Sequence, residues 1–234
     1  MSLKSTGWRW SLLLCGCLLV GFSAVQDPAR WEAAIREFEA ADERDLQGQV
    51  DIVFLGSSSI RLWDLDHYFP GLRTLNRGFG GSQISDSLHY AERLVFPYSP
   101  KVIVFYAGDN DINFGKCPQI VFEDYRAFVT KIRRRLRNTR IIFVAIKPSL
   151  SRWHLVEKMR KANQMIEGFS KRVPCLEYLD IDGPMIGPDG RPRDELFVED
   201  GLHLSPLGYQ LWTEALIPLL HSEKGVDCAT ISKY

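Results

Sequence analysis

The sequence predicts an α/β fold, a three-layer sandwich in which helices cover both faces of a central parallel sheet of about five strands. Strand-like segments alternate with segments of helical periodicity along most of the chain. The strongest strand segments are continuous apolar runs, which indicates strands buried on both faces. The 234 residues are enough for one domain with a well-filled core.

Five segments carry the strand signal and five carry the helix signal. The clearest strands read "VDIVFLG", "KVIVFYAG" and "RIIFVAI", and the segment 72–78 is weaker. The first and last helices open with Asp-Pro and Ser-Pro, which is typical of a helix start. No repeat or linker interrupts residues 25–234, so we treat them as one domain. The predicted strands are 50–56, 72–78, 101–108, 140–146 and 175–181, and the predicted helices are 27–45, 84–95, 121–137, 154–172 and 205–220.

Residues 1–24 are predicted to be a secretory signal peptide. A basic start, "MSLKSTGWR", precedes the apolar run "WSLLLCGCLLVGFSAV", which closes on small residues. The run is shorter than the ~20 residues that a spanning helix needs. We therefore expect cleavage near Ser23–Ala24, a periplasmic or secreted protein, and no stable membrane insertion afterwards. An uncleaved anchor and a lipoprotein attached at Cys17 are the alternatives.

The charge composition gives no sign of a nucleic-acid partner. Lys+Arg and Asp+Glu balance at 29 each, which gives no push toward nucleic acid. The basic segment 132–140 lacks interleaved aromatic residues, so we expect a solvated helix face and a turn.

The cysteine and histidine residues do not indicate a metal site. No Cys/His cluster has metal-ligand spacing, and we expect no metal. Beyond the leader, Cys117, Cys175 and Cys228 allow at most one disulfide, and we expect Cys175 to be a buried thiol within a strand.

Four polar stretches follow predicted strands. They are "GSSS" (56–59), "NRGFGGSQ" (76–83), "GDNDIN" (108–113) and, past a long loop, "DGLHLS" (200–205). Ligands of parallel sheets collect at the carboxyl ends of the strands. All four stretches therefore fall on one edge, where a hydroxyl, glycine amides, a carboxamide and an Asp/His pair converge.

These groups match the requirements of serine attack on an ester. The hydroxyl needs a base, the base needs an orienting carboxylate, and the oxyanion needs placed donors. Asp200 and His203 are spaced so that the carboxylate reaches the imidazole, while Asn110 and Gly81 offer N–H donors. Ile60 stands where the second glycine of a G-x-S-x-G elbow belongs, which argues against an ordinary α/β-hydrolase. Each stretch alone also fits a plain turn or helix cap, and the residues do not distinguish the three serines.

Together, the four stretches resemble the conserved blocks of the SGNH hydrolases, also called the GDSL esterase/lipase family. The blocks are "FLGSSSI" (54–60), "NRGFGG" (76–81), "GDND" (108–111) and "DGLH" (200–203), in the family's order. The resemblance extends over nearly all of residues 25–234. It implies a flavodoxin-like sheet, no metal or organic cofactor, and hydrolysis through an acyl-enzyme.

The resemblance also implies a role for each site residue. Ser58 would be the nucleophile, with His203 as base and Asp200 as its partner. The oxyanion donors would be the backbone amides of Ser58 and Gly81 and the side chain of Asn110. Ser57 stands where the family often has Asp. This departure leaves the attacking hydroxyl in place but changes the side chain that is available to support the turn.

We therefore predict a serine esterase that acts on carboxylic esters. Short acyl or acetyl chains are expected because no long apolar lid insertion is present. The substrate class stays open among small esters, lipids and acetylated saccharides. An O-acyltransferase acting on a carbohydrate and a non-catalytic binding protein are the alternatives. Aromatic residues near the blocks either line a pocket or belong to the core: Trp63, Tyr68, Phe69, Trp153 and Phe197.

Overall fold

The computed structural model describes residues 27–45, 48–222 and 228, so the predicted signal peptide lies outside the described residues. Five parallel strands form one sheet in the order β2-β1-β3-β4-β5. This is the flavodoxin-like order, and the predicted fold class is confirmed. The strands are β1 (Ile52–Gly56), β2 (Thr74–Gly78), β3 (Val102–Tyr106), β4 (Arg140–Val144) and β5 (Leu176–Leu179).

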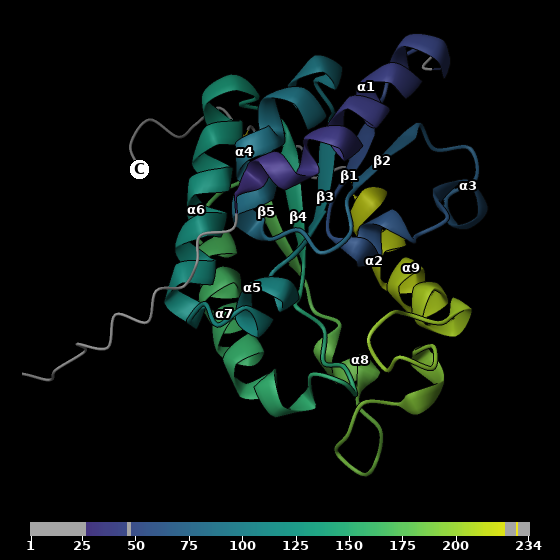
Figure 1. Ribbon diagram of the computed structural model, residues 1–234, viewed down its shortest axis with the longest axis vertical. Helices are drawn as coiled ribbons and strands as arrows, with labels where there is room; N and C mark the ends of the chain where they lie inside the picture. Colours follow the sequence, from purple (N-terminus) through teal and green to yellow (C-terminus); the bar gives the residue numbers. More distant parts are fainter. Residues whose placement is uncertain (1–26, 46–47, 223–227, 229–234) are drawn as a thin grey trace, which may run out of the picture.

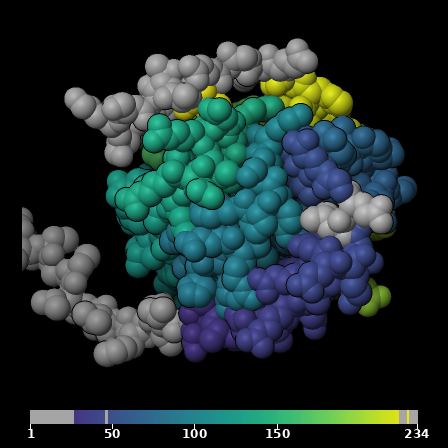
Figure 2. Space-filling model, turned by 90° about the horizontal axis from the view of Figure 1, so that it is seen from above, coloured from purple at the N-terminus to yellow at the C-terminus, as the bar shows by residue number. Residues whose placement is uncertain are grey.

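Helices cover both faces of the sheet (Figure 1). One face packs against α1 (Glu32–Asp45), α4 (Ile84–Leu94), α6 (Pro118–Arg135) and α7 (Val156–Ser170). The other packs against α2 (Ser58–Arg61), α3 (Leu65–Tyr68), α8 (Asp182–Met185) and α9 (Pro206–Leu220). Figure 2 shows the purple residues of α1 beside the blue segment that contains α4, with the green residues of α6 next to it.

Alternate residues of the three central strands, β1, β3 and β4, enter two separate cores. In β1, Val53 and Leu55 pack toward α1, α4 and α6, whereas Ile52 and Phe54 pack toward α2 and α9. All four side chains are buried. Burial on both faces explains why this strand is a continuous apolar run in the sequence.

The first and last helical segments begin at residues that the sequence marks as caps. Asp27 accepts a hydrogen bond from the amide of Ala29 at the start of η1 (Pro28–Trp31), and Ser205 accepts one from Gly208 at the start of α9. The short elements were not predicted, because segments of three to five residues show no helical period. They are α2, α3, α8, α5 (Asp109–Asn113), η2 (Phe96–Tyr98), η3 (Trp153–Leu155) and η4 (Asp194–Leu196). In the described part, no helix is both long and apolar enough to cross a membrane.

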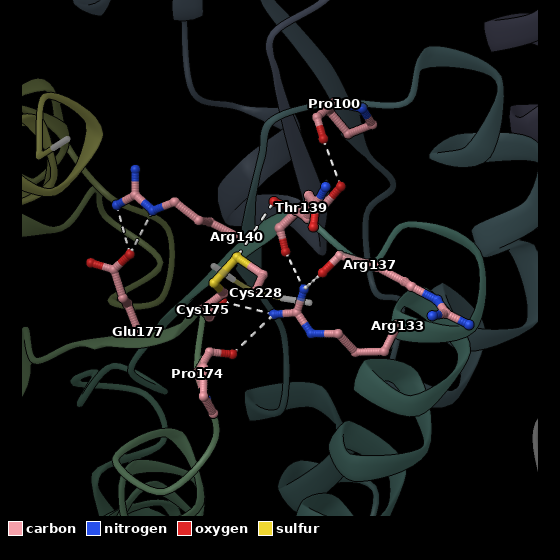
Figure 3. The surroundings of a disulfide bond; sticks show 10 residues. Pro100, Arg133, Arg137, Thr139, Arg140, Pro174, Cys175, Glu177 and Cys228 are labelled. Carbon is pink, nitrogen blue, oxygen red and sulfur yellow. Dashed lines mark hydrogen bonds and ion pairs between the residues drawn. A yellow bond between two sulfur atoms is a disulfide. The ribbon is translucent and has the colours of Figure 1, made fainter. Parts of the chain in front are cut away.

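The prediction that Cys175 is a free thiol is wrong, because Cys175 forms a disulfide with Cys228 (Figure 3). The Cα atoms are 5.6 Å apart, and 53 residues separate the two cysteines. Cys175 is buried, as expected, but it precedes β5 in a turn with φ +59° instead of lying within the strand. At this end of the edge strand Cys175 lies within reach of Cys228. Cys117 is free and exposed.

The basic segment 132–140, which begins in the last turn of α6, is only partly a solvated face. Arg134, Arg135 and Arg137 are exposed, as predicted. Arg133 instead turns toward the disulfide, where its guanidinium donates to the carbonyls of Cys175 (2.9 Å) and Thr139 (Figure 3). This arginine thus joins the end of α6 to the loop that carries the disulfide.

Candidate active site

The predicted site residues lie at the point where the strand order of the sheet reverses. The chain runs from β1 outward to β2 and then returns to β3 on the other side of β1. Ligands of such sheets bind in the crevice formed at this switch point. Ser58 follows the end of β1 after one intervening residue, and Asn110 lies in α5, which follows β3 after a connection of two residues.

A close approach of two strands shapes the turn that carries Ser58. A Cβ atom on Gly56 would lie 1.8 Å from the carbonyl oxygen of Tyr106, so only glycine fits there. The amide of Ser57 donates to that same oxygen at 3.0 Å. Ser58 then opens α2, where its own N–H has no intrahelical acceptor and is available to a ligand.

The neighbouring serines have other surroundings. The Ser57 hydroxyl is fully buried and has no hydrogen-bond partner among the described residues. The Ser59 hydroxyl is buried and accepts a bond from Lys147 at 3.2 Å. Of the triplet, Ser58 alone is bonded to a histidine in the described residues, a distinction that tertiary contacts make and the sequence pattern does not.

The structure brings Ser58, His203 and Asp200 into one hydrogen-bonded line. His203 Nε2 lies 3.0 Å from Ser58 Oγ, and His203 Nδ1 lies 2.6 Å from Asp200 Oδ2. The other oxygen of Asp200 accepts from the amides of Leu202 (2.8 Å) and His203 (2.9 Å). Burial raises the pKa of Asp200, but these hydrogen bonds outweigh it and lower the pKa to about 2. The carboxylate is therefore ionised at neutral pH and can hold the imidazole in one tautomer.

The predicted oxyanion donors are linked to the same turn through Ser82. The Ser82 hydroxyl donates to the carbonyl of Gly56 at 3.2 Å, and its carbonyl accepts from Asn110 Nδ2 at 3.0 Å. The turn that holds Gly81 closes with a bond from the Ser82 amide to Phe79 at 3.3 Å. Gly81 has φ +80°, which this turn requires at its third position.

A buried charged network under the site was not predicted from the sequence. Lys147, which is 1% exposed, donates to Ser59 and to the hydroxyl of Tyr106 (3.1 Å). Its Nζ lies 3.6 Å from Asp109, which also pairs with Arg152 at 2.9 Å. Burial lowers the pKa of Lys147. The position of Lys147 directly after the buried strand "RIIFVAI" could have indicated a lysine near the site. Nothing in the sequence places Arg152 near Asn110.

Most of the aromatic residues near the four blocks belong to the core. Trp63, Phe69 and Phe197 are 2%, 3% and 7% exposed and pack among α2, α3 and α9. Tyr68 and Trp153 stay partly exposed. Within the described residues, no group of three or more His, Cys, Asp or Glu side chains is arranged to hold a metal ion.

Comparison with known proteins identifies the family. Residues 62–211 match the model of the GDSL-like Lipase/Acylhydrolase family. The chain belongs to this family. The predicted ester-bond hydrolase is thereby confirmed at the level of the GDSL family. The matched region contains Gly81, Asn110, Asp200 and His203, and Ser58 lies just ahead of it.

The individual proteins that this chain resembles are distant from it in sequence. The chain is 29% identical over 205 residues to the platelet-activating factor acetylhydrolase IB subunit alpha1 of Bos taurus, covering 84% of each chain. A GDSL-like lipase from Bacteroides thetaiotaomicron matches with a TM-score of 0.70 and 18% identity, over 86% of this chain and 100% of that one. A carbohydrate esterase family 3 protein from Talaromyces cellulolyticus matches with a TM-score of 0.58 and 17% identity, over 74% and 96%. The two structures support the fold alone.

Proposed function

We propose that this protein is a serine esterase that hydrolyses short-chain acyl or acetyl esters through an acyl-enzyme on Ser58. The observation that carries the proposal is the line of hydrogen bonds from Ser58 through His203 to Asp200. Such a line supplies a nucleophile, a base and an orienting carboxylate in one place. Membership of the GDSL family makes an ester bond the expected target.

The first half-reaction forms the acyl-enzyme. Ser58 Oγ attacks the ester carbonyl carbon while His203 Nε2 takes the hydroxyl proton. Asp200 balances the positive charge that develops on the imidazole. The oxyanion is held by the amides of Ser58 and Gly81 and by the side chain of Asn110. His203 then gives the proton to the leaving alkoxide, and the ester C–O bond breaks.

The second half-reaction repeats these steps with water. His203 takes a proton from water, whose oxygen attacks the acyl carbon, and then returns the proton to Ser58 Oγ as the free acid leaves. The exposed fractions of His203 and Asp200 side chains, 29% and 46%, are consistent with ready access of water.

A short acyl chain fits the surroundings of the nucleophile. Ser59, next to Ser58 in the chain, forms a buried polar group with Tyr106 and Lys147, and the sequence contains no long apolar insertion that would enclose a long acyl chain. The nearby Trp63 and Phe69 are core residues. The bovine relative is named an acetylhydrolase, which supports the same preference.

Covalent labelling tests the proposed nucleophile. A fluorophosphonate should label the wild-type protein on Ser58, and Ser58→Ala should abolish labelling and lower kcat by roughly 10⁴–10⁶-fold. Ser57→Ala is the matched control, because it removes an adjacent hydroxyl that has no partner in the described residues. Labelling that persists in Ser58→Ala, or a wild-type protein that resists labelling, would contradict the assignment.

A series of p-nitrophenyl esters tests the acyl-chain preference. We expect the acetyl and butyryl esters to turn over fastest, and faster turnover of chains of ten or more carbons would overturn the preference. Product analysis with an added sugar acceptor distinguishes hydrolysis from acyl transfer. Predominant formation of the acylated sugar would replace the esterase proposal with a transferase.

We also propose that the protein is exported. The basic, apolar and small-residue order of residues 1–24 supports export. The disulfide between Cys175 and Cys228 adds support, because disulfides persist mainly in oxidising compartments. Expression in a bacterial host followed by cell fractionation and N-terminal sequencing tests this. Full-length protein with an intact leader in the cytoplasm would contradict it.

A further inference from the structure

Two neighbours determine which way the Asn110 carboxamide faces. Its Oδ1 accepts from Arg152 Nη1 at 3.1 Å, and its Nδ2 donates to the carbonyl of Ser82 at 3.0 Å. A guanidinium can only donate and a carbonyl can only accept, so the two contacts together exclude the flipped amide. The second N–H of Nδ2 is then left for another acceptor.

The guanidinium that selects this orientation is itself firmly held. Arg152 Nη1 also donates to Asp109 Oδ2 at 2.9 Å, and Lys147 Nζ lies 3.6 Å from the same oxygen. The other oxygen of Asp109 accepts a hydrogen bond from the backbone N–H of Asn110 at 2.9 Å. The side chains of Arg152 and Asp109 are 13% and 5% exposed. Charge-assisted bonds in such a buried place are stronger and geometrically more specific than neutral ones.

We propose that Arg152 is a positioning residue of the oxyanion hole, which orients Asn110 so that one N–H of its side chain points at the developing oxyanion. The inference depends on the proposed esterase function. Without Arg152, rotation about χ2 of Asn110 becomes less restricted, because this terminal torsion has a broad, roughly two-fold profile. The flipped state presents a carbonyl oxygen to the oxyanion and repels it.

A double-mutant cycle tests whether Arg152 acts through Asn110. We expect Arg152→Met to lower kcat for p-nitrophenyl acetate by roughly 10–100-fold, less than the ~10²–10³-fold loss expected for removing the donor itself in Asn110→Ala. The KM should stay nearly constant, because the donor acts on the transition state. In the Asn110→Ala background, Arg152→Met should cost less than about 2-fold more, since no carboxamide remains to be oriented.

Two further variants separate positioning from a general structural effect. Arg152→Lys keeps a group that only donates and should recover most of the activity lost in Arg152→Met. Arg140→Met is the matched control. Arg140 has a similar exposed fraction, 15%, and a carboxylate partner, Glu177, but starts β4 at the opposite edge of the sheet. It should leave kcat within about 2-fold of wild type.

Each outcome decides the question. If the losses of kcat in Arg152→Met and Asn110→Ala multiply in the variant that carries both changes, the positioning role is overturned. An Arg152→Lys protein as slow as Arg152→Met would also overturn it. If Arg152→Met fails to fold, Arg152→Gln, alone and in the Asn110→Ala background, provides the same comparison, because a neutral amide both donates and accepts and so no longer excludes the flipped carboxamide. A wild-type protein that is neither labelled on Ser58 nor active would refute the esterase function instead.

Discussion

Asp200 is more exposed than the histidine it orients, yet its geometry is fully specified. Three hydrogen bonds reach its two oxygens, two from backbone amides and one from the imidazole. The amide bonds come from the same short segment, so local sequence determines how the carboxylate faces His203. Only the contact from His203 to Ser58 depends on the rest of the fold.

Asp200→Asn should lower kcat by roughly 10²–10⁴-fold, because an amide no longer fixes the tautomer or balances the imidazolium. The partial exposure of Asp200 places the expected loss toward the lower end. The backbone contacts to Oδ1 can remain, so the melting temperature should change little. Steady-state kinetics and thermal melts of the variant check both, and a loss under about 3-fold would argue against the triad role.

The short helix α5 connects the site to the surrounding helices. Asp111 of α5 accepts from the amide of Ile84 at the start of α4 (3.2 Å) and from Lys116 (2.9 Å). Lys116 in turn reaches Asp124 on α6 at 2.6 Å. These contacts fix α5, which carries Asn110, against α4 and α6.

The Asp111 junction predicts a pH dependence of stability. Burial raises the pKa of Asp111 to about 6, against the lowering effect of Lys116. Since its ordinary value is 3.8, the folded state binds more protons than the unfolded state between those values. The contribution of this group to the free energy of unfolding therefore rises as pH falls through about 6.

Urea unfolding of wild type and Asp111→Asn at several pH values measures this contribution. The stability difference, wild type minus variant, should increase by about 1–3 kcal/mol from about pH 7 to about pH 4. Glu43→Gln, an exposed change on α1, controls for the loss of one carboxylate. A difference that is flat or falls with acidification would show that the burial of Asp111 does not govern this range.

The disulfide between Cys175 and Cys228 closes a covalent loop with a sequence separation of 53 residues. The disulfide joins the residue before β5 to Cys228, and Arg133 of α6 bonds to the carbonyl of Cys175 (Figure 3). The cross-link lies at the amino end of β5, while the candidate site lies at the carboxyl ends of β1 and β3. We therefore expect the disulfide to affect stability and leave catalysis largely unchanged.

Cys228→Ser should lower the free energy of unfolding by about 2–4 kcal/mol, because the cross-link restricts a long loop in the unfolded chain. The melting temperature should fall by roughly 5–12 °C. Reductant should produce a similar shift in the wild type and none in the variant, while Cys117→Ser should melt like wild type. A variant as stable as the oxidised wild type would show that the disulfide contributes nothing.

The sequence by itself determined the layered α/β fold and the edge of the sheet where the candidate site lies. It could do so because strands buried on both faces are continuous apolar runs, and because carboxyl ends of parallel strands share one edge. Tertiary structure decided what depends on contacts between distant segments. These are the pairing of Cys175 with Cys228, the burial of Trp63 and Phe69, and the Lys147–Asp109–Arg152 network. Such side chains carry no local period or motif, so only the packing of the folded chain brings them together.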